Sequence, residues 1–437
     1  MNLPSATKKL IFFSFPIIVG QLGQMLIAAG DVYIASMHST ESVASIGVAG
    51  GVLNPIFLFG IGLMMGISPA MAISRGEGSD TKNNLFSIIG YSLLYGLLLS
   101  FIMIIINKFV PYFGFDEKLV KPIQDYIDIV LWSIPFALLF QGIKEYLQAY
   151  DKVMLPNILS IVGVVLNLGI NYILCFGYKN FDGLGTIGLA YASFLIRFIL
   201  AIVILAMVFK KIDFSQFSLS FITKTFKFSV PIAFMFFLEV LAFCTVTILS
   251  GKLGIVEAAA NNIIMTIASI AFMIPLSMSS AIATKVGHAL GAKNYIELRI
   301  YTRASIYMVG AFVLVSASFF YLFPVEIMAI VSKDPAVIKL GVSLLFIVMI
   351  FQFFDGFQVL LTGILRGLKS TRVSSILVFV GYWVIGIPTG VLLAFNTPLG
   401  AKGLWIGLAI SLGIVAFALT IYTSTIFKKL ELIHEDI

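Results

Sequence analysis

The chain has 437 residues, of which 60% are hydrophobic and only 11% charged, and its net charge is +7. A soluble domain carries about 25% charged residues, so a water-soluble protein of this length would lack the polar surface to cover itself. This composition excludes a soluble enzyme, a disordered chain and a nucleic-acid-binding domain. The basic residues fall mainly in short loops between apolar runs, which is typical of a polytopic membrane protein.

Twelve apolar runs follow one another along the chain, and most are longer than the roughly 20 residues that cross a bilayer as a helix. Transmembrane strands would instead alternate apolar and polar residues over about ten positions. The predicted spans are residues 10–35, 43–74, 85–107, 123–147, 154–177, 186–209, 226–250, 257–284, 302–323, 338–365, 373–396 and 402–427. The sequence therefore predicts an all-α integral membrane protein with twelve transmembrane helices.

The loops on the two sides of the predicted membrane differ in charge. Nineteen of the 28 Lys and Arg residues fall in the segments that share a side with the termini, and 8 fall in the opposite segments. Basic loops stay in the cytoplasm. We therefore expect a multi-pass protein of a bacterial-type cytoplasmic membrane, with both termini in the cytoplasm.

The second half of the chain echoes the first. Residues 13–16 are matched by residues 228–231, and a second pair of segments, 184–189 and 399–404, has the same offset of 215 residues. Six spans per repeat make the repeats parallel, which is a common plan of secondary transporters with a central cavity. The predicted domains are an N-lobe (residues 1–215, spans one to six) and a C-lobe (residues 216–437, spans seven to twelve), with a linker at about 210–227.

Four charged residues lie deep inside these spans: Asp31, Arg197, Glu239 and Asp355. A charge in the bilayer core is costly and marks a functional site by default. Glu239 is twelve residues from Lys227, roughly 18 Å along a helix, which places it near the midplane. Asp355 reaches a similar depth and Asp31 lies in the outer half. The partner of Arg197 cannot be named from the sequence.

Amide side chains accompany these acids at helical spacing. Gln24 shares a face of the first helix with Asp31, Gln352 lies one turn before Asp355, and Asn167 and Asn171 are an i, i+4 pair. One carboxylate with neutral amide oxygens suits a hard cation such as Na⁺, or H⁺ bound by the carboxyl itself. The alternative is that these groups only join helices by hydrogen bonds.

Motifs of other protein classes are missing from the sequence. It contains no Gly-rich nucleotide-binding loop ending in Gly-Lys-Ser/Thr, no His/Cys cluster with metal-ligand spacing and no catalytic constellation. We therefore predict neither an enzyme nor a protein with a resident cofactor. The only ion expected is a transported Na⁺ or H⁺.

The motifs together resemble the multidrug and toxic compound extrusion (MATE) family, especially its NorM-like branch. The residues that carry the resemblance are Asp31 near the outer end of the first helix, Asn167-x-x-x-Asn171, residues 228–231 leading to Glu239, Gln352 to Asp355 followed by residues 363–367, and the glycine loop 287–292. The resemblance covers nearly the whole chain. It implies a cation-coupled antiporter that exports amphiphilic, often cationic, drugs by alternating access.

The resemblance also implies roles for single residues. Glu239 and Asp355 match the acids of the family's C-lobe, whereas Asp31, Asn167 and Asn171 match its N-lobe cation site. Ser193 stands where relatives place a hydroxyl on the sixth helix. Some H⁺-coupled relatives carry an acid in place of Asn171, so this departure favours Na⁺ at the N-lobe residues.

Two other transporter classes compete with this reading. A lipid-linked precursor or oligosaccharide flippase of the same superfamily usually has a strongly basic cavity, whereas here three deep acids face one arginine. A major-facilitator carrier would need a loop motif between spans two and three that residues 74–80 do not match. We expect a monomer whose partners are the lipid bilayer and small amphiphilic organic cations, and no nucleic acid.

Overall fold

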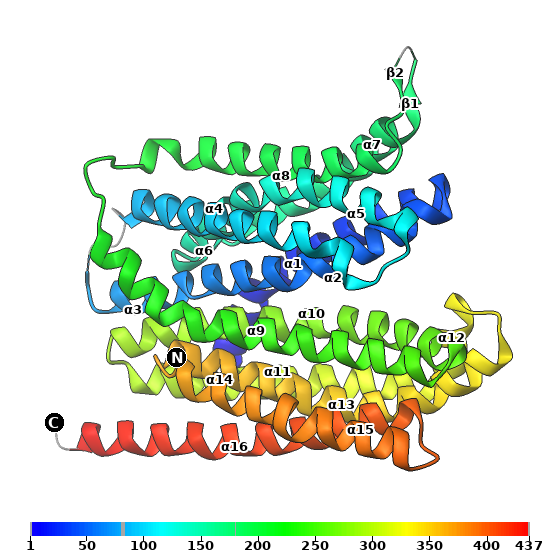
Figure 1. The fold of residues 1–437 in the computed structure, drawn as a ribbon. Helices are drawn as coiled ribbons and strands as arrows, with labels where there is room; N and C mark the ends of the chain where they lie inside the picture. The colour runs from blue at the N-terminus through cyan, green and yellow to red at the C-terminus, as the bar shows by residue number, and fades with distance from the viewer. Residues whose placement is uncertain (1, 80–83, 180, 436–437) are drawn as a thin grey trace. The chain divides into compact units, whose positions relative to one another are not determined.

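The fold is given by a computed structural model, which describes residues 2–79, 84–179 and 181–435 (Figure 1). Lys82, one of the basic residues counted for the orientation, lies outside the described residues. The helices of the first half are α1 (Leu3–His38), α2 (Thr40–Met65), α3 (Ile67–Gly76), α4 (Leu85–Phe109), α5 (Glu117–Val130), α6 (Ile134–Ala149), α7 (Met154–Phe176) and α8 (Thr186–Val208).

The second half is equally helical. Its helices are α9 (Leu219–Leu253), α10 (Ile255–Gly291), α11 (Tyr295–Leu322), α12 (Pro324–Val331), α13 (Pro335–Gly367), α14 (Thr371–Phe379), α15 (Ile387–Asn396) and α16 (Ala401–Glu435). A π-helical segment, Val380–Gly386, joins α14 to α15. One small hairpin, of β1 (Gly177–Tyr178) and β2 (Phe181–Asp182), follows α7.

Twelve helical stretches of the described chain are long and apolar enough to cross a membrane. The described helices outnumber the spans because α2 with α3, α5 with α6, and α14 with α15 each make one span, and α12 is short. This confirms the predicted all-α architecture with twelve transmembrane helices. In the bilayer core a helix is favoured because it satisfies its own backbone hydrogen bonds.

Helix ends extend beyond the apolar runs where a polar side chain can cap them. The Ser39 hydroxyl accepts a hydrogen bond from the Ser42 amide at 3.0 Å at the start of α2. The Asn294 side chain accepts from the Glu297 amide at 3.0 Å at the start of α11, and these bonds satisfy amides that a helix leaves unpaired. Most predicted spans are therefore shorter than the observed helices.

Contacts divide the chain into two compact units. The N-terminal unit consists of Phe15–Met71 and Ser79–Ala233, and the C-terminal unit consists of Met1–Ser14, Ala72–Gly78 and Phe234–Ile437. Both α1 and α9 therefore contribute residues to each unit. The predicted lobes with a boundary at residue 215 stay a prediction.

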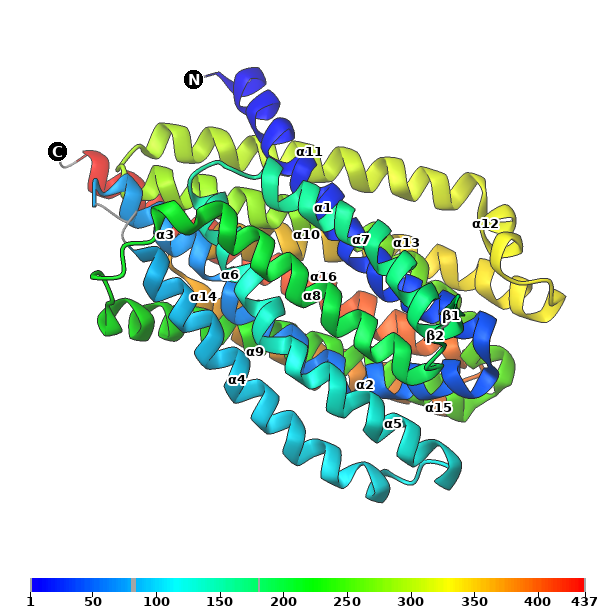
Figure 2. The ribbon, with the colours of Figure 1, turned by 90° about the horizontal axis from the view of Figure 1, so that it is seen from above.

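Each unit buries its own apolar core. The core of the N-terminal unit lies between α2, α4, α5, α6 and α8, and α7 runs beside α8 in both views (Figures 1 and 2). In the C-terminal unit α13 packs against α10, α11 and α16. There the indole of Trp405 is fully buried and donates a hydrogen bond to the Asn261 side chain at 3.0 Å.

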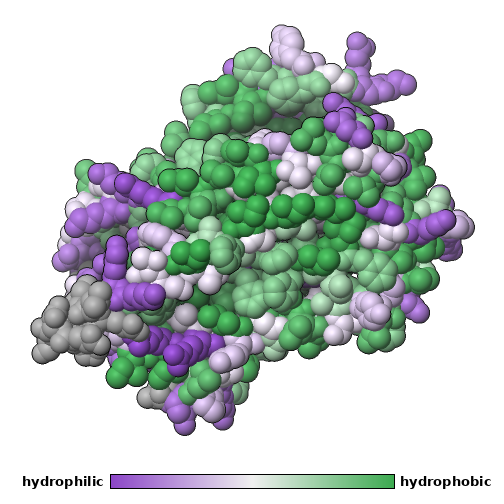
Figure 3. Space-filling view, turned by 90° about the horizontal axis from the view of Figure 1, so that it is seen from below, coloured by the Kyte–Doolittle hydropathy of each residue, from purple (hydrophilic) through white to green (hydrophobic). Residues whose placement is uncertain are grey.

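One face of the outer surface is largely apolar. Figure 3 shows a broad hydrophobic face with hydrophilic residues gathered toward its margins. Large side chains such as Phe417, Val315 and Ile376 are more than half exposed. Such a surface would be an aggregation hazard in water, so it fits contact with lipid tails.

Candidate functional site

A buried polar cluster in the N-terminal unit is centred on Asp31 of α1. The Asn171 side-chain amide donates to Asp31 Oδ1 at 2.6 Å, and that of Asn167 donates to the same oxygen at 3.2 Å. The Ser193 hydroxyl donates to Asp31 Oδ2 at 2.7 Å. Three helices (α1, α7 and α8) therefore bring together four residues that the sequence singled out.

Local sequence explains how α7 approaches α1 so closely. Gly30 directly precedes Asp31, and a Cβ atom at that position would lie 2.9 Å from Leu168 and 3.4 Å from the Asn167 side-chain oxygen. Gly20, two to three turns earlier on α1, leaves room for Asn157 of α7 in the same way. Small residues at a helix interface let the backbones approach within the membrane.

The cluster is closed to solvent and contains one hydrogen-bond acceptor without a donor. Asn167 and Asn171 are fully buried and Asp31 is 7% exposed. The side-chain oxygen of Asn171 has no hydrogen-bond partner, whereas that of Asn167 accepts from Asn171 at 3.0 Å. An unpaired buried acceptor is costly, so the set of oxygens fits a small cation that would use it.

Arg197, whose partner the sequence could not supply, lies one turn after Ser193 on α8. Its guanidinium donates to the Ser133 hydroxyl at 2.8 Å and lies 4.7 Å from the centre of the Phe57 ring. In the described part of the chain no carboxylate lies within salt-bridge distance of it. Arg197 interacts electrostatically with Asp31 and with the buried Tyr126 of α5.

Gln24 was predicted to support the same cluster. It lies on α1 and is partly buried, but within the described residues no hydrogen bond joins it to Asp31 or to another side chain. Asp31 follows Gln24 by seven residues, which is about two helical turns, roughly 10 Å along the axis. Gln24 and Asp31 are therefore too far apart along α1 for direct contact, although the sequence places them on the same face.

The C-terminal unit holds the other two deep acids. Glu239 lies on α9 and Asp355 on α13, both are 4% exposed, and their carboxyl groups interact electrostatically. Tyr382 of the π-helical segment donates to Glu239 Oε1 at 3.3 Å. Asp355 Oδ1 has no hydrogen-bond partner. Two buried acids with so few donors favour neutralisation, either by a proton or by a bound cation.

Other polar groups of α13 continue this region. The Gln352 side-chain oxygen accepts from the Ser316 hydroxyl of α11 at 3.2 Å, and its nitrogen has no partner. Gln358, one turn beyond Asp355, is fully buried and neither atom of its amide is paired. Gln358 is not among the residues predicted from the sequence, although it follows Asp355 by only three positions.

Two basic residues lie deeper than the sequence suggested. Lys144 and Arg366 were counted with the cytoplasmic loops, but they lie within α6 and α13 and are 2% exposed. Arg366 donates to the Ser279 hydroxyl at 2.7 Å. Lys144 stands three residues before the end of a predicted span and Arg366 directly after one, and in the structure neighbouring helices enclose both.

The aromatic residues that lie beside Glu239 could not be predicted from the sequence either. Tyr382 contacts Glu239, and the Trp383 indole donates to the Leu238 carbonyl at 3.1 Å. Consecutive residues of a regular helix differ in direction by about 100°, but both of these reach α9 from a π-helical segment. With 14% aromatic residues in the chain, no pattern distinguished these two.

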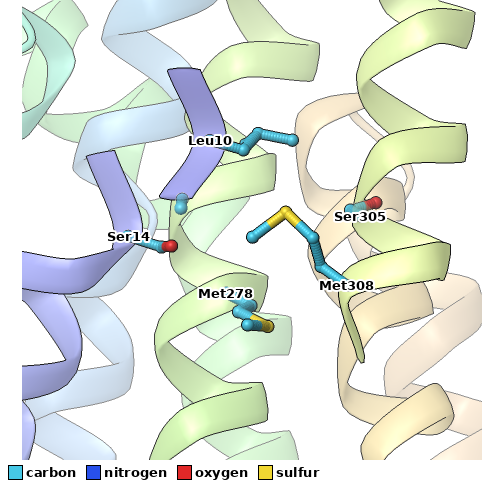
Figure 4. Close-up of a pocket in the computed structure, with 6 residues that line it drawn as sticks. Leu10, Ser14, Met278, Ser305 and Met308 are labelled. Atoms are coloured by element: carbon cyan, nitrogen blue, oxygen red, sulfur yellow. The ribbon is translucent and has the colours of Figure 1, made fainter. Parts of the chain in front are cut away.

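A small pocket in the C-terminal unit is not part of either acidic site. It lies between the N-terminal part of α1, the C-terminal half of α10 and the middle of α11, and Figure 4 shows Leu10, Ser14, Met278, Ser305 and Met308 around it. The Ser14 and Ser305 hydroxyls already donate to backbone carbonyls. The pocket therefore offers apolar packing and no free donor for a ligand.

Known proteins resemble this chain over almost its full length. A probable multidrug resistance protein NorM from Photorhabdus laumondii is 26% identical over 427 residues, which cover 95% of this chain and 94% of the relative. A MATE transporter structure from Vibrio cholerae superposes with a TM-score of 0.90 at 19% identity and 98% coverage of both chains. A MOP superfamily transporter from Pyrococcus furiosus, described as having a binding pocket of reverse polarity, has a TM-score of 0.89 at 21% identity, with 98% and 97% coverage.

At these identities the two structures establish the fold alone. The family model MatE matches residues 16–173 and 231–392, which together make up well over half of the chain. These two segments contain Asp31, Asn167 and Asn171 and the acids Glu239 and Asp355, whereas Ser193 lies between them. The chain therefore belongs to the MatE family, as its sequence motifs had predicted.

Proposed function

We propose that the protein is a cation-coupled antiporter that exports amphiphilic organic cations across a bacterial cytoplasmic membrane by alternating access. Both termini lie in the cytoplasm in this proposal, and Na⁺ is the coupling ion. The relatives named as multidrug resistance proteins support the substrate class. The observation that carries the proposal is the burial of three carboxylates inside apolar helices, each with few neighbours that could neutralise it.

The Asp31 cluster suits the coupling ion. Its five oxygens come from one carboxylate, two amides and one hydroxyl, so they provide hard ligands with only one negative charge. In the structure the two amide nitrogens point at Asp31. Rotation of an amide by about 180° would exchange its nitrogen for its oxygen, because the two ends are similar in shape. Na⁺ binding would require such a rotation or use of the unpaired Asn171 oxygen.

The acidic pair of the C-terminal unit suits an organic cation. Glu239 and Asp355 supply negative charge in a setting of low dielectric, where a positive group is held strongly. Tyr382 is the only hydrogen-bond donor to Glu239 among the described residues. A drug with a positive charge and an apolar body would therefore be attracted here, and transport follows if loading one unit favours release from the other.

The proposal is tested first in cells and then in a defined system. Cells that express the protein should extrude ethidium, and Asp355→Asn or Glu239→Gln should abolish this extrusion. In proteoliposomes at symmetric pH, an inward Na⁺ gradient should drive the drug outward. Dependence on a pH gradient alone would replace Na⁺ with H⁺, and full ethidium export by both acid variants would refute the role of the acidic pair.

Transport of an anionic lipid precursor is the second candidate. Lys144 and Arg366 are buried and Arg197 is partly buried within transmembrane helices, and the similar transporter from Pyrococcus furiosus is described as having a pocket of reverse polarity. An anionic substrate would need those charges. Proteoliposomes that move a lipid-linked pyrophosphate analogue but not ethidium would favour this candidate over drug export.

A further inference from the structure

We propose that Arg197 is a tethered cation that replaces the coupling ion at Asp31 when that ion leaves. The inference rests on the proposed function, since it assumes that Asp31 binds Na⁺. In the structure the guanidinium lies on Ser133 and Phe57 rather than on Asp31, and we take this to be its position while the ion is bound. In the ion-free protein it moves to Asp31 and neutralises it.

The position of Arg197 on α8 makes this exchange geometrically possible. Arg197 follows Ser193 by four residues, so the two side chains lie on the same face of the helix. Four residues correspond to roughly 6 Å along the axis, which an extended arginine side chain can span. The Ser193 hydroxyl is 2.7 Å from Asp31 Oδ2, so the carboxylate lies one turn from Arg197.

The present contacts of the guanidinium are neutral and few. It has five N–H donors, and one of them donates to Ser133, with the Phe57 ring as the other neighbour in the described structure. The Ser133 hydroxyl itself donates to the Val130 carbonyl at 2.5 Å, so it can still accept from Arg197. A guanidinium inside a membrane protein normally pairs with a carboxylate, and this one lies beside a carboxylate without pairing with it in the described structure.

The state of Asp31 explains why the pairing is incomplete. Its two oxygens already accept three hydrogen bonds from neutral donors, Asn167, Asn171 and Ser193. These bonds stabilise the charge but do not cancel it. Departure of a bound cation would leave a net negative charge in a region of low dielectric, and Arg197 is the basic residue that interacts electrostatically with Asp31.

Competition between Arg197 and the ion has a consequence for transport. An antiporter must release its coupling ion on the side where it is delivered, and a built-in substitute charge makes release easier at the expense of affinity. Arg197 is therefore inferred to set the Na⁺ affinity of the Asp31 cluster. Removing it should tighten Na⁺ binding and slow the release of the ion.

The experiment compares Na⁺-dependent thermal stabilisation of the purified full chain in detergent for the wild type, Arg197→Met, Arg197→Lys and Arg372→Met. Methionine keeps an unbranched side chain without charge, and Arg372 is an exposed arginine that controls for loss of a positive charge. We expect Arg197→Met to lower the Na⁺ concentration of half-maximal stabilisation by roughly tenfold. Arg197→Lys should remain near the wild type, and Arg372→Met should not shift the midpoint.

A charge-rescue variant separates this role from a packing role against Phe57. Without Na⁺, Arg197→Met should lower Tm because Asp31 is left uncompensated, and the double variant Asp31→Asn/Arg197→Met should recover most of the loss. An unchanged Na⁺ midpoint in Arg197→Met would overturn the inference. The inference would also be overturned if Arg197→Met lowered Tm by the same amount in the wild type and in the Asp31→Asn background.

Failure of the inference is distinguishable from failure of the proposed function. If the wild type shows no stabilisation by Na⁺, Arg197 does not compete with Na⁺ and the inference falls. Ethidium export that is nevertheless abolished by Asp31→Asn would leave the antiporter proposal standing. If Asp31→Asn exports ethidium normally, the proposed role of the N-terminal cluster falls with the inference.

Discussion

The two buried acidic regions of the molecule stabilise their carboxylates to different degrees. Asp31 accepts three hydrogen bonds from neutral side chains and has an arginine within electrostatic reach. Glu239 and Asp355 have one hydroxyl donor, from Tyr382, and they repel each other. The first region is preorganised around one charge, whereas the second concentrates two acids with little to neutralise them.

This difference predicts that the two regions bind different kinds of cation. A cluster with preset oxygens and one charge discriminates among small cations by size and geometry. A pair of acids attracts any positive group, and its selectivity must come from the surrounding apolar and aromatic walls. We therefore assign the coupling ion to the N-terminal cluster and the organic cation to the C-terminal acids, as the proposal to be tested.

The largest effect is expected when the acids of the two regions are neutralised one at a time. Asp31→Asn and Asp355→Asn should each reduce ethidium export by more than about tenfold, because each removes a buried charge that a transported cation would meet. Only Asp31→Asn should also abolish stabilisation by Na⁺. Glu41→Gln, which changes an exposed acid in the first turn of α2, is the matched control. Loss of the Na⁺ response in Asp355→Asn instead would reverse the assignment.

A smaller effect is expected from the hydroxyl on α8. Ser193→Ala removes a 2.7 Å hydrogen bond to Asp31, and bonds to charged groups contribute about 1.5–3 kcal/mol. The Na⁺ midpoint of thermal stabilisation should therefore rise by roughly tenfold, while the export rate at saturating Na⁺ changes less. Ser160→Ala is the control, because the Ser160 hydroxyl on α7 donates only to the Pro156 carbonyl. Equal midpoints for both variants would remove Ser193 from the ion site.

A still smaller effect should follow from the one donor of the C-terminal region. Tyr382→Phe removes the 3.3 Å bond to Glu239 while keeping the buried ring. A long bond lies at the weak end of the range, so ethidium export should fall about threefold with no change of the Na⁺ midpoint. Tyr91→Phe removes a comparable hydroxyl, which donates to the Leu63 carbonyl in the other unit, and should leave export unchanged. A shifted Na⁺ midpoint in Tyr382→Phe would show that the regions are not separable.

The smallest effect is expected at Gln24. No hydrogen bond joins it to the Asp31 cluster within the described structure, so Gln24→Ala should change the Na⁺ midpoint by less than about twofold. Sodium titration of thermal stability measures this directly. A tenfold change would mean that Gln24 reaches the ion in another conformation of α1, and the cluster would then be larger than the four residues joined here.

The sequence determined the membrane-spanning architecture of this protein. Apolar runs and sparse charge suffice for the twelve spans, because every backbone group in lipid must be paired within its own helix. Counting residues also predicted the depth of Asp31, Glu239 and Asp355 within their spans. Their cost in lipid made them visible as candidates without any knowledge of their neighbours.

The tertiary structure alone decided which side chains meet. Asp31 is bonded to residues that lie 136, 140 and 162 positions away in the chain, and helical periodicity gives the face of each helix but not the helix that it packs against. The Ser133 partner of Arg197 and the Tyr382 donor of Glu239 arise from the same long-range packing. The burial of Lys144 and Arg366 does so too, since neighbouring helices enclose charges that stand at the ends of apolar runs.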